Sequence, residues 1–151
     1  MTTIRDQDRT VVLFVCVRNS GKSQIAAALA RRDAPAAVEI RSAGTAPAPD
    51  VSAEAAAVVE QVGATCRGEY PKELLAADLG EAGRVVLLGG EVDVEPLLEE
   101  LDRSGASRPA VERWELDEPS ERGVEGLERL VLLRDDIAAR VEALLADVAP
   151  R

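Results

Sequence analysis

Residues 10–24 read TVVLFVCVRNSGKSQ, and this stretch decides the fold. Residues 10–16 form a continuous apolar run rich in valine, which is typical of a strand buried on both faces. The polar loop that follows contains a glycine, and a helical pattern begins at Ser23. A loop between a buried strand and a helix can direct several backbone N–H groups, and the helix N-terminus, at one anion.

The rest of the chain continues the alternation of strands and helices. Further strands are expected at residues 37–40, 84–88 and 110–116, and helices at residues 23–32, 52–62, 72–79, 94–101 and 124–148. This order predicts one domain, residues 1–151, with a four-stranded parallel sheet flanked by helices. Ligands of such sheets bind beyond the carboxyl ends of the strands, which is where the loop after residue 16 lies.

Composition excludes several classes of function. The net charge of −10 disfavours nucleic acid and anionic membranes as partners. The chain has no histidine, which excludes Cys–His and Ser–His–Asp catalysis and most zinc sites. Two cysteines are too few for a disulfide framework. Residues 1–9 lack the apolar stretch of a signal peptide, and residues 11–17 are too short to span a bilayer, so we expect a cytoplasmic protein.

Cys16 is the candidate nucleophile, because it ends the first strand and its sulfur should point at the anion. The side chains of Lys22 and Arg18, together with the helix N-terminus, would stabilise the thiolate of Cys16, which is its reactive form. The residues expected to surround the anion are Val17, Arg18, Asn19, Ser20, Gly21, Lys22 and Ser23. No bound cofactor and no metal are expected. The alternative is a structural cysteine beside an ordinary turn.

Two known patterns resemble this loop. The first is the P-loop of nucleotide hydrolases, G-x-x-x-x-G-K-[ST], of which residues 16–23 lack only the first glycine. The third expected strand, however, ends Leu87-Leu88-Gly89-Gly90 and offers no carboxylate for magnesium. A P-loop NTPase is therefore the weaker alternative.

The second resemblance is closer and covers nearly the whole chain. The low-molecular-weight protein tyrosine phosphatases, and the arsenate reductases built on the same flavodoxin-like fold, have a C-x5-R-S loop with an asparagine three residues after the cysteine. Residues 16–23 match this loop with lysine for the arginine, and SQIAAA at 23–28 resembles the S-Q-M-A-x-A of the reductases. The family motifs R-S-A-G-T and W-x-x-x-D-P are matched at residues 41–45 and 114–119, the latter with glutamate for aspartate.

The resemblance implies a role for each matching residue of the loop. Cys16 corresponds to the nucleophile, and Lys22 stands where an arginine binds the oxyanion. Ser23 corresponds to the hydroxyl that stabilises the thiolate. Asn19 and Ser42 correspond to a hydrogen-bonded pair that maintains the shape of the loop.

The resemblance also implies a proton donor. Glu118 stands where an aspartate protonates the leaving group, and Asp117 beside it competes for this role. From the residues alone, both carboxylates could equally be solvated turn residues before Pro119.

The choice between the two activities depends on aromatic residues and on cysteines. A tyrosine phosphatase needs aromatic walls around a phenyl ring, and residues 120–123 contain none. Tyr70 is the remaining candidate and is better explained as a loop surface residue. The thioredoxin-coupled reductases have resolving cysteines near the third strand, where residues 84–96 have none, and Cys66 is expected to fill the core.

The chain therefore resembles the actinobacterial arsenate reductases that use mycothiol. This resemblance implies arsenate, or a phosphate-like oxyanion, as substrate and a small external thiol as co-substrate. A glutaredoxin-type reductase would then release arsenite. A low-molecular-weight phosphatase and a catalytically degenerate oxyanion-binding protein are the alternatives.

Overall fold

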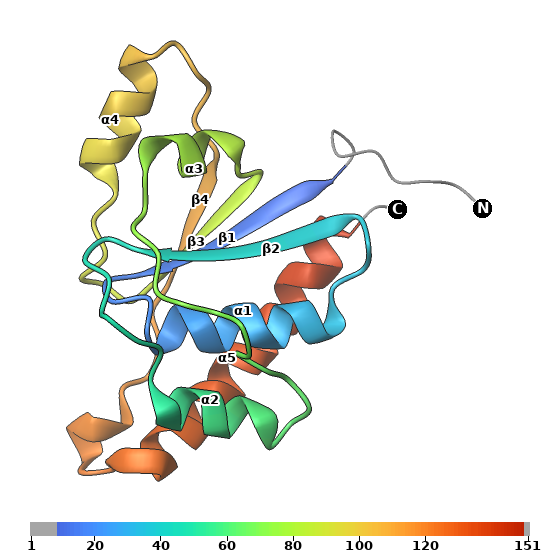
Figure 1. Ribbon diagram of the computed structural model, residues 1–151, viewed down its shortest axis with the longest axis vertical. Coiled ribbons are helices and arrows are strands. Elements are labelled where there is room, and N and C mark those ends of the chain that lie inside the picture. Colours follow the sequence, from blue (N-terminus) through green and yellow to red (C-terminus); the bar gives the residue numbers. More distant parts are fainter. Residues whose placement is uncertain (1–8, 150–151) are drawn as a thin grey trace.

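The computed structural model describes residues 9–149 and contains one parallel sheet of four strands (Figure 1). The strands are β1 (Thr10–Cys16), β2 (Val38–Gly44), β3 (Arg84–Leu88) and β4 (Ala110–Trp114). Their order across the sheet is β2-β1-β3-β4, so β1 has a neighbour on each side. This confirms the predicted fold class. The N-terminal segment examined for a signal peptide lies, apart from Arg9, outside the described residues.

Helices cover both faces of the sheet. They are α1 (Lys22–Asp33), α2 (Ala53–Glu60), α3 (Ala76–Glu81), α4 (Glu95–Arg103) and α5 (Gly126–Val148), with a 3-10 turn η2 at Pro119–Arg122. Figure 1 shows α1, α2 and α5 on one side of the sheet and α3 and α4 on the other. Each side has its own apolar core, and β1 contributes to both.

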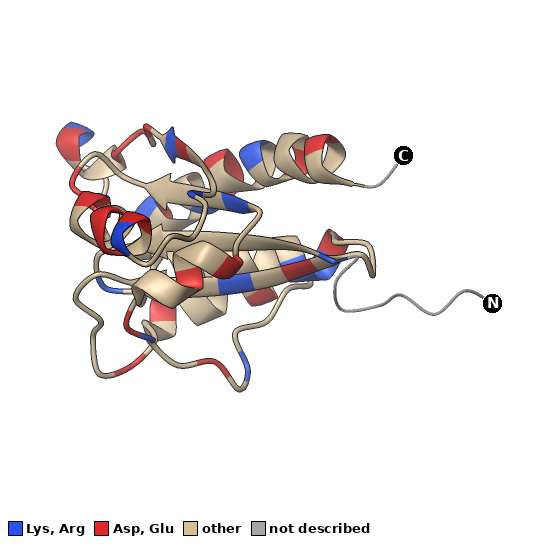
Figure 2. Cartoon of the chain, turned by 90° about the horizontal axis from the view of Figure 1, so that it is seen from above, with Lys and Arg blue, Asp and Glu red and all other residues tan. Residues whose placement is uncertain are grey.

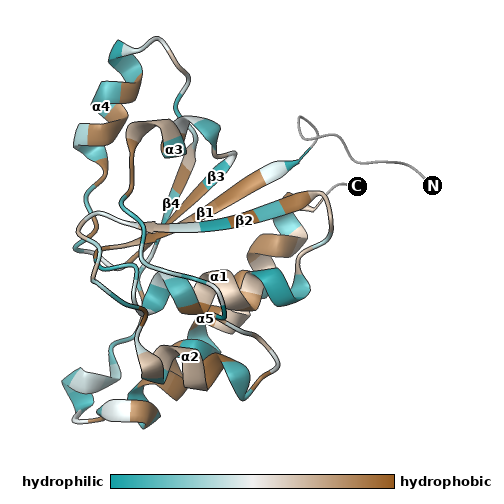
Figure 3. Ribbon diagram, viewed as in Figure 1, coloured by the Kyte–Doolittle hydropathy of each residue, from teal (hydrophilic) through white to brown (hydrophobic). Residues whose placement is uncertain are grey.

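The side chains of β1 alternate between the two cores. Val12 and Phe14 belong to the core beneath α1 and α5, and Leu13 and Val15 belong to the core beneath α3 and α4. All four are at most 2% exposed, which explains why the run contains no polar residue. Figure 3 shows the same concentration of hydrophobic residues along the strands. The Trp114 ring packs against Phe14, with the ring centroids 5.9 Å apart.

The structure corrects the prediction for residues 72–79. A helix was expected there, but α3 begins only at Ala76. Residues 72–74 instead extend the edge of β2: Gly44 N donates to Lys72 O at 2.8 Å, and Leu74 N donates to Gly44 O at 2.8 Å. β2 is correspondingly longer than predicted and continues to Gly44, because it pairs with β1 along the whole length of that strand.

Charged residues of both signs are spread over the helices and loops around the sheet (Figure 2). Acidic residues predominate, 28 against 18. Between residues 9 and 149, none of the helices combines the length and hydrophobicity required to cross a bilayer.

Candidate functional site

The Cys16 thiol lies at the carboxyl end of the central strand and is hydrogen-bonded from within the following loop. Asn19 N donates to its sulfur at 3.2 Å, and Ser23 Oγ lies 2.9 Å from it. The Ser23 oxygen accepts a hydrogen bond from Asn19 Nδ2 at 2.7 Å, which leaves the hydroxyl hydrogen of Ser23 free to point at sulfur. The Cys16 sulfur therefore has two hydrogen-bond partners from its own loop.

Asn19 determines the shape of the loop. It is fully buried and has φ 49°, a left-handed conformation that asparagine adopts more readily than most residues. Its Oδ1 accepts a hydrogen bond from Lys72 N at 2.8 Å, and its carbonyl accepts one from Gln24 Nε2 at 3.1 Å. The expected Asn19–Ser42 pair is not formed, because the Asn19 amide is occupied by Ser23 and Lys72. The buried Ser42 hydroxyl has no partner within the described chain.

The motif at residues 41–45 supports the loop from the side. The backbone N–H groups of residues 45, 46 and 48 donate to the carbonyls of residues 16, 17 and 18 at 2.8–3.2 Å, which continues the pairing of the two strands into the loop. The close approach requires glycine at position 44. A Cβ atom on Gly44 would lie 2.7 Å from the Val17 carbonyl oxygen and 2.9 Å from Asn19 N and Cβ.

A hollow of about 210 Å³ opens above Cys16. Its lining consists of Cys16, Val17, Arg18, Gly21, Lys22 and Glu91. The helix α1 begins beside the hollow, with Gly21 as its N-cap, no side-chain cap and no acidic residue in its first turn. Its first N–H groups, the Lys22 ammonium and the Arg18 guanidinium therefore make this hollow suitable for an anion. Five of these six residues were predicted from the sequence.

Three of the predicted loop residues do not line the hollow: Asn19, which is fully buried, Ser20 and Ser23. Ser23 lies behind Cys16, as described above, and is fully buried. The Ser20 hydroxyl points away and donates to Asp50 O at 2.8 Å. Ser20 therefore attaches the loop to the segment before α2.

Glu118 is a fixed carboxylate. Its two oxygens accept hydrogen bonds from Arg129 at 2.6 and 2.7 Å, and one of them also accepts from Ser120 N and Oγ at 3.1 and 3.0 Å. The bonds from Arg129, followed by those from Ser120, lower the pKa of Glu118 to about 2. Lys22 Nζ lies 3.8 Å from it. Glu118 is therefore ionised at neutral pH, which does not suit the proton-donor role that the resemblance implied.

Asp117 is also engaged in an ion pair. Both of its carboxylate oxygens lie 2.7 Å from Arg122 Nη1 in an exposed turn. Neither Asp117 nor Glu118 is among the residues that line the hollow over Cys16.

Glu91 is the residue of the hollow that the sequence analysis missed. It follows β3, the neighbour of β1, so the carboxyl ends of the two strands bring it close to Cys16. The available signal was its position three residues after a predicted parallel strand.

Cys66 and Tyr70 have the structural roles that were expected. Cys66 is buried in the core beneath α1, with its sulfur 4.0 Å from Gln24 O, and both cysteines are free thiols. Burial, and then the charge of Glu69, raise the pKa of Cys66. Tyr70 is 63% exposed and contacts Lys72, outside the hollow.

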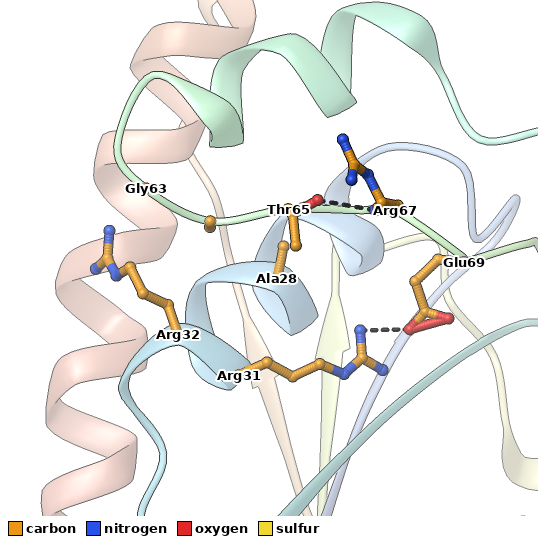
Figure 4. A pocket seen from close by; sticks show the side chains of 8 residues that line it. Ala28, Arg31, Arg32, Gly63, Thr65, Arg67 and Glu69 are labelled. Carbon is orange, nitrogen blue, oxygen red and sulfur yellow. Dashed lines mark hydrogen bonds and ion pairs between the residues drawn. The ribbon is translucent and has the colours of Figure 1, made fainter.

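A second hollow, of about 230 Å³, lies at the opposite end of α1 (Figure 4). Three arginines border it, but they do not converge on one point. Arg31 pairs with Glu69 at 2.5 Å, and Arg32 donates to Val62 O at 2.7 Å. In Figure 4, Arg67 extends away from both of them. The hollow above Cys16 is therefore the better candidate for an oxyanion site.

Comparison with known proteins finds arsenate reductases among the proteins that this chain resembles. A protein of Halobacterium salinarum that carries the provisional name arsenate reductase is 33% identical over 145 residues, which cover 91% of this chain and 92% of that protein. A solved arsenate reductase in a phosphate-binding state matches with a TM-score of 0.73 and 26% identity, over 93% of this chain and 99% of that one. The thioredoxin-dependent arsenate reductase of Corynebacterium glutamicum matches with a TM-score of 0.71 and 25% identity. That match covers 95% of this chain but only 63% of that longer protein.

The family model for low-molecular-weight phosphotyrosine protein phosphatases matches residues 11–151. A match of this extent decides against the P-loop NTPase alternative. It also agrees with the structure, in which the loop after β1, the motif at residues 41–45 and the segment before η2 meet at one end of the sheet. The chain therefore belongs to the low-molecular-weight phosphotyrosine protein phosphatase family, whose fold it shares with solved arsenate reductases.

Proposed function

We propose that this protein is an arsenate reductase that uses a small external thiol. The observation that carries the proposal is the composition of the hollow: a nucleophilic Cys16 beside two cations, with no aromatic side chain and no second cysteine among the lining residues that the structure describes. A site of this kind suits a small inorganic oxyanion better than a phosphotyrosine side chain, whose ring needs an apolar surface.

The first step is attack by the Cys16 thiolate on arsenic. An S–As bond forms, an As–O bond breaks, and the departing hydroxide takes up a proton and leaves as water. Arsenic remains in the pentavalent state. Lys22, Arg18 and the first N–H groups of α1 stabilise the negative charge of the arsenate oxygens during this exchange.

The second step requires a thiol from outside the chain. Cys66 lies in the core with a raised pKa, so it is poorly suited to attack the arsenic on Cys16. A small thiolate, for which we propose mycothiol, attacks arsenic instead, so that Cys16 leaves as thiolate and a thiol–arsenate adduct is released. A glutaredoxin-type thiol then attacks the sulfur of this adduct. A disulfide forms between the two thiols as the S–As bond breaks. The electron pair of that bond stays on arsenic, which is thereby reduced from the pentavalent state to arsenite.

Free thiols of this kind persist in the cytoplasm, where we place the reaction. No bound cofactor takes part in the scheme, since the external thiols supply both electrons.

A phosphatase is the second candidate function, and the family match supports it. The first step is the same with phosphorus in place of arsenic, and water rather than a thiol then attacks the intermediate. The two functions therefore differ in the second nucleophile and not in the oxyanion loop.

The deciding experiment follows arsenite formation from arsenate by the purified chain. The assay is run with mycothiol and its glutaredoxin-type reductant, with thioredoxin and its reductase, and without thiol. We expect arsenite only with mycothiol, unchanged turnover in Cys66→Ser and none in Cys16→Ser. Hydrolysis of aryl phosphates without arsenite formation under any condition would establish the phosphatase instead. Oxyanion binding with neither reaction would identify a degenerate member of the family.

A further inference from the structure

We propose that Glu91 selects, by charge, the thiol that completes the reaction at Cys16. The proposal rests on the function proposed above and names the class of its second substrate, a thiol without a carboxylate near its sulfur. Glu91 is the acidic residue in the lining of the hollow, where it lies with Cys16, Lys22 and Arg18. An exposed carboxylate is negatively charged at neutral pH, so the lining carries charges of both signs.

Reagents reach the Cys16 sulfur through this hollow. The Cys16 residue is only 6% exposed, and the residues that hydrogen-bond its sulfur from within the loop, Asn19 and Ser23, are fully buried. The hollow itself measures about 210 Å³, so a small molecule inside it is close to every lining side chain. A charged reagent therefore meets the field of Glu91 at short range, where Coulomb interactions are strongest.

The turn after β3 places the Glu91 carboxylate in a defined position. Gly89 has φ +117°, and a Cβ atom there would lie 2.7 and 2.8 Å from the two Glu91 carboxylate oxygens. The carboxylate therefore lies against the backbone of the turn, in the space that a side chain at position 89 would fill. Gly89 is fixed in turn by two hydrogen bonds, from its N–H to Trp114 O at 3.2 Å and from Arg113 to its carbonyl at 2.6 Å.

No cation within residues 9–149 neutralises Glu91, because its carboxylate forms no ion pair and no side-chain hydrogen bond there. The Lys22 ammonium group instead lies 3.8 Å from the carboxylate of Glu118. A second carboxylate adds to the negative field of the turn: Glu115 Oε2 lies 3.8 Å from the position of a Cβ atom on Gly90. The β3 side of the hollow is therefore negative, whereas the side formed by the oxyanion loop and α1 is positive.

This arrangement affects the two steps differently. An entering oxyanion meets Lys22, Arg18 and the first N–H groups of α1, and together these outweigh one carboxylate. Once arsenate is bonded to Cys16, its oxygens occupy these donors. The second nucleophile then meets the charges of Glu91 and of the arsenate oxygens, which are all negative. A carboxylate on that nucleophile adds a repulsion that an uncharged thiol does not experience.

Glu91 exchanges no atom or proton in this step. The sulfur of the external thiolate forms a bond to arsenic, the bond between arsenic and the Cys16 sulfur breaks, and its electron pair leaves with Cys16 as thiolate. Arsenic remains pentavalent. Glu91 acts through its charge alone, so it determines specificity and is not a catalytic residue.

A pair of alkylating reagents tests this role without turnover. Iodoacetate and iodoacetamide transfer groups of almost the same size to Cys16 with loss of iodide, and they differ by one negative charge. Mass spectrometry of the Cys16 peptide gives both rates, and their ratio cancels any change in the thiolate fraction. We expect Glu91→Gln to raise the ratio of the iodoacetate rate to the iodoacetamide rate about threefold. Glu91→Asp, which keeps the charge, should stay close to the wild type.

Asp93→Asn is the matched control. Asp93 belongs to the same loop, is exposed and lies outside the hollow, and its Oδ1 accepts a hydrogen bond from Glu95 N, which asparagine can also accept. The substitution removes the same charge two residues away. It should change the ratio of the two alkylation rates by less than about 1.5-fold.

Salt separates an effect of charge from an effect of shape. Raising the ionic strength from about 0.01 M to about 1 M shortens the Debye length from about 30 Å to about 3 Å, so the threefold difference between Glu91→Gln and the wild type should disappear. A difference that persists at high salt would contradict selection by charge. Equal ratios in Glu91→Gln and Asp93→Asn at low salt would contradict it as well.

The second measurement compares two thiols in arsenate reduction. Glutathione carries two carboxylates and mycothiol carries none, and a glutaredoxin-type reductant is supplied with each. The ratio of kcat/KM for glutathione to kcat/KM for mycothiol should rise about tenfold in Glu91→Gln, because each carboxylate contributes about threefold. It should stay unchanged in Asp93→Asn.

The two measurements fail independently. If the wild type forms arsenite and Glu91→Gln leaves the thiol ratio unchanged, the assignment of the thiol class is wrong. If neither thiol supports arsenite formation by any of the variants, the proposed function fails. The alkylation ratio then decides alone whether Glu91 discriminates by charge among reagents that reach Cys16.

Discussion

Arg129 of α5 donates two hydrogen bonds to Glu118, one to each carboxylate oxygen, at 2.6 and 2.7 Å. The pair joins the long C-terminal helix to the turn that precedes η2, beside Lys22 of the oxyanion loop. Two-point contacts of this kind fix both partners more precisely than single ion pairs do. The position of the Lys22 ammonium group therefore depends on a helix that is distant in sequence.

The ion pair predicts how stability depends on pH. The pKa of Glu118 falls from an ordinary 4.5 to about 2 in the folded chain, so the carboxylate stabilises the fold above about pH 4.5. This contribution is lost as the pH falls through 4.5 towards 2, since the unfolded chain then binds a proton that the folded chain does not. Urea unfolding of the wild type and of Glu118→Gln should differ by about 1 kcal/mol at neutral pH and converge near pH 2. A constant difference at all pH values would contradict the assignment.

Substitutions of Lys22 should change oxyanion affinity to different degrees. Lys22→Ala should weaken sulfate binding by about 1.5–3 kcal/mol, the range for a hydrogen bond to a charged group. Lys22→Arg should retain or improve the affinity, because guanidinium offers two donors in a fixed geometry. Calorimetric titration measures both variants. Equal affinity in the alanine variant and the wild type would place the anion elsewhere.

Gly44 predicts a steric effect of one methyl group. Gly44→Ala puts a carbon 2.7 Å from the Val17 carbonyl oxygen, so the loop or β2 must shift, at a cost of about 1–3 kcal/mol. Gly90→Ala is the control, because its Cβ atom would meet its nearest neighbour at an ordinary 3.8 Å. Thermal unfolding compares the two, and equal melting temperatures would show that the loop accommodates the methyl group.

The two cysteines should differ in reactivity. Both cysteines are largely buried, but Cys16 lines the oxyanion hollow, whereas Cys66 lies in the core beneath α1 and burial raises its pKa. Iodoacetamide should therefore modify one thiol per folded chain at neutral pH and two after unfolding, with peptide mass spectrometry locating the first on Cys16. Sulfate should slow the first modification, because it occupies the same hollow. Equal labelling of both thiols in the folded chain would contradict the burial of Cys66.

The parts of the site that could be predicted depend on local sequence. The buried run that ends at Cys16 and the helix that begins at Lys22 are adjacent in the chain, so their patterns alone placed an anion loop between them. The parts that were missed depend on long-range contacts. Residues 72–74 are extended because they pair with Gly44, and the pKa of Glu118 is lowered because Arg129 of α5 donates to its carboxylate. Sequence patterns of single segments carry no information about such partners.

Glu91 was missed for a related reason. Its place in the lining of the hollow results from the pairing of β1 with β3, which brings the carboxyl ends of the two strands together. Gly89 has a positive φ, and the Glu91 carboxyl group occupies the space that a side chain at position 89 would fill. Asn19, in contrast, was found by resemblance, although its observed partners are Ser23 and Lys72 rather than Ser42.

The contact between Trp114 and Phe14 provides a built-in optical probe. Trp114 is the sole tryptophan of the chain, it is 5% exposed, and it packs against the strand residue two positions before Cys16. Its emission therefore reports on the centre of the sheet. The single tyrosine, Tyr70, lies in an exposed loop, and its backbone carbonyl accepts a hydrogen bond from Gln24 Nε2. Selective excitation of the indole therefore follows loosening of the sheet in an unlabelled protein without a contribution from Tyr70.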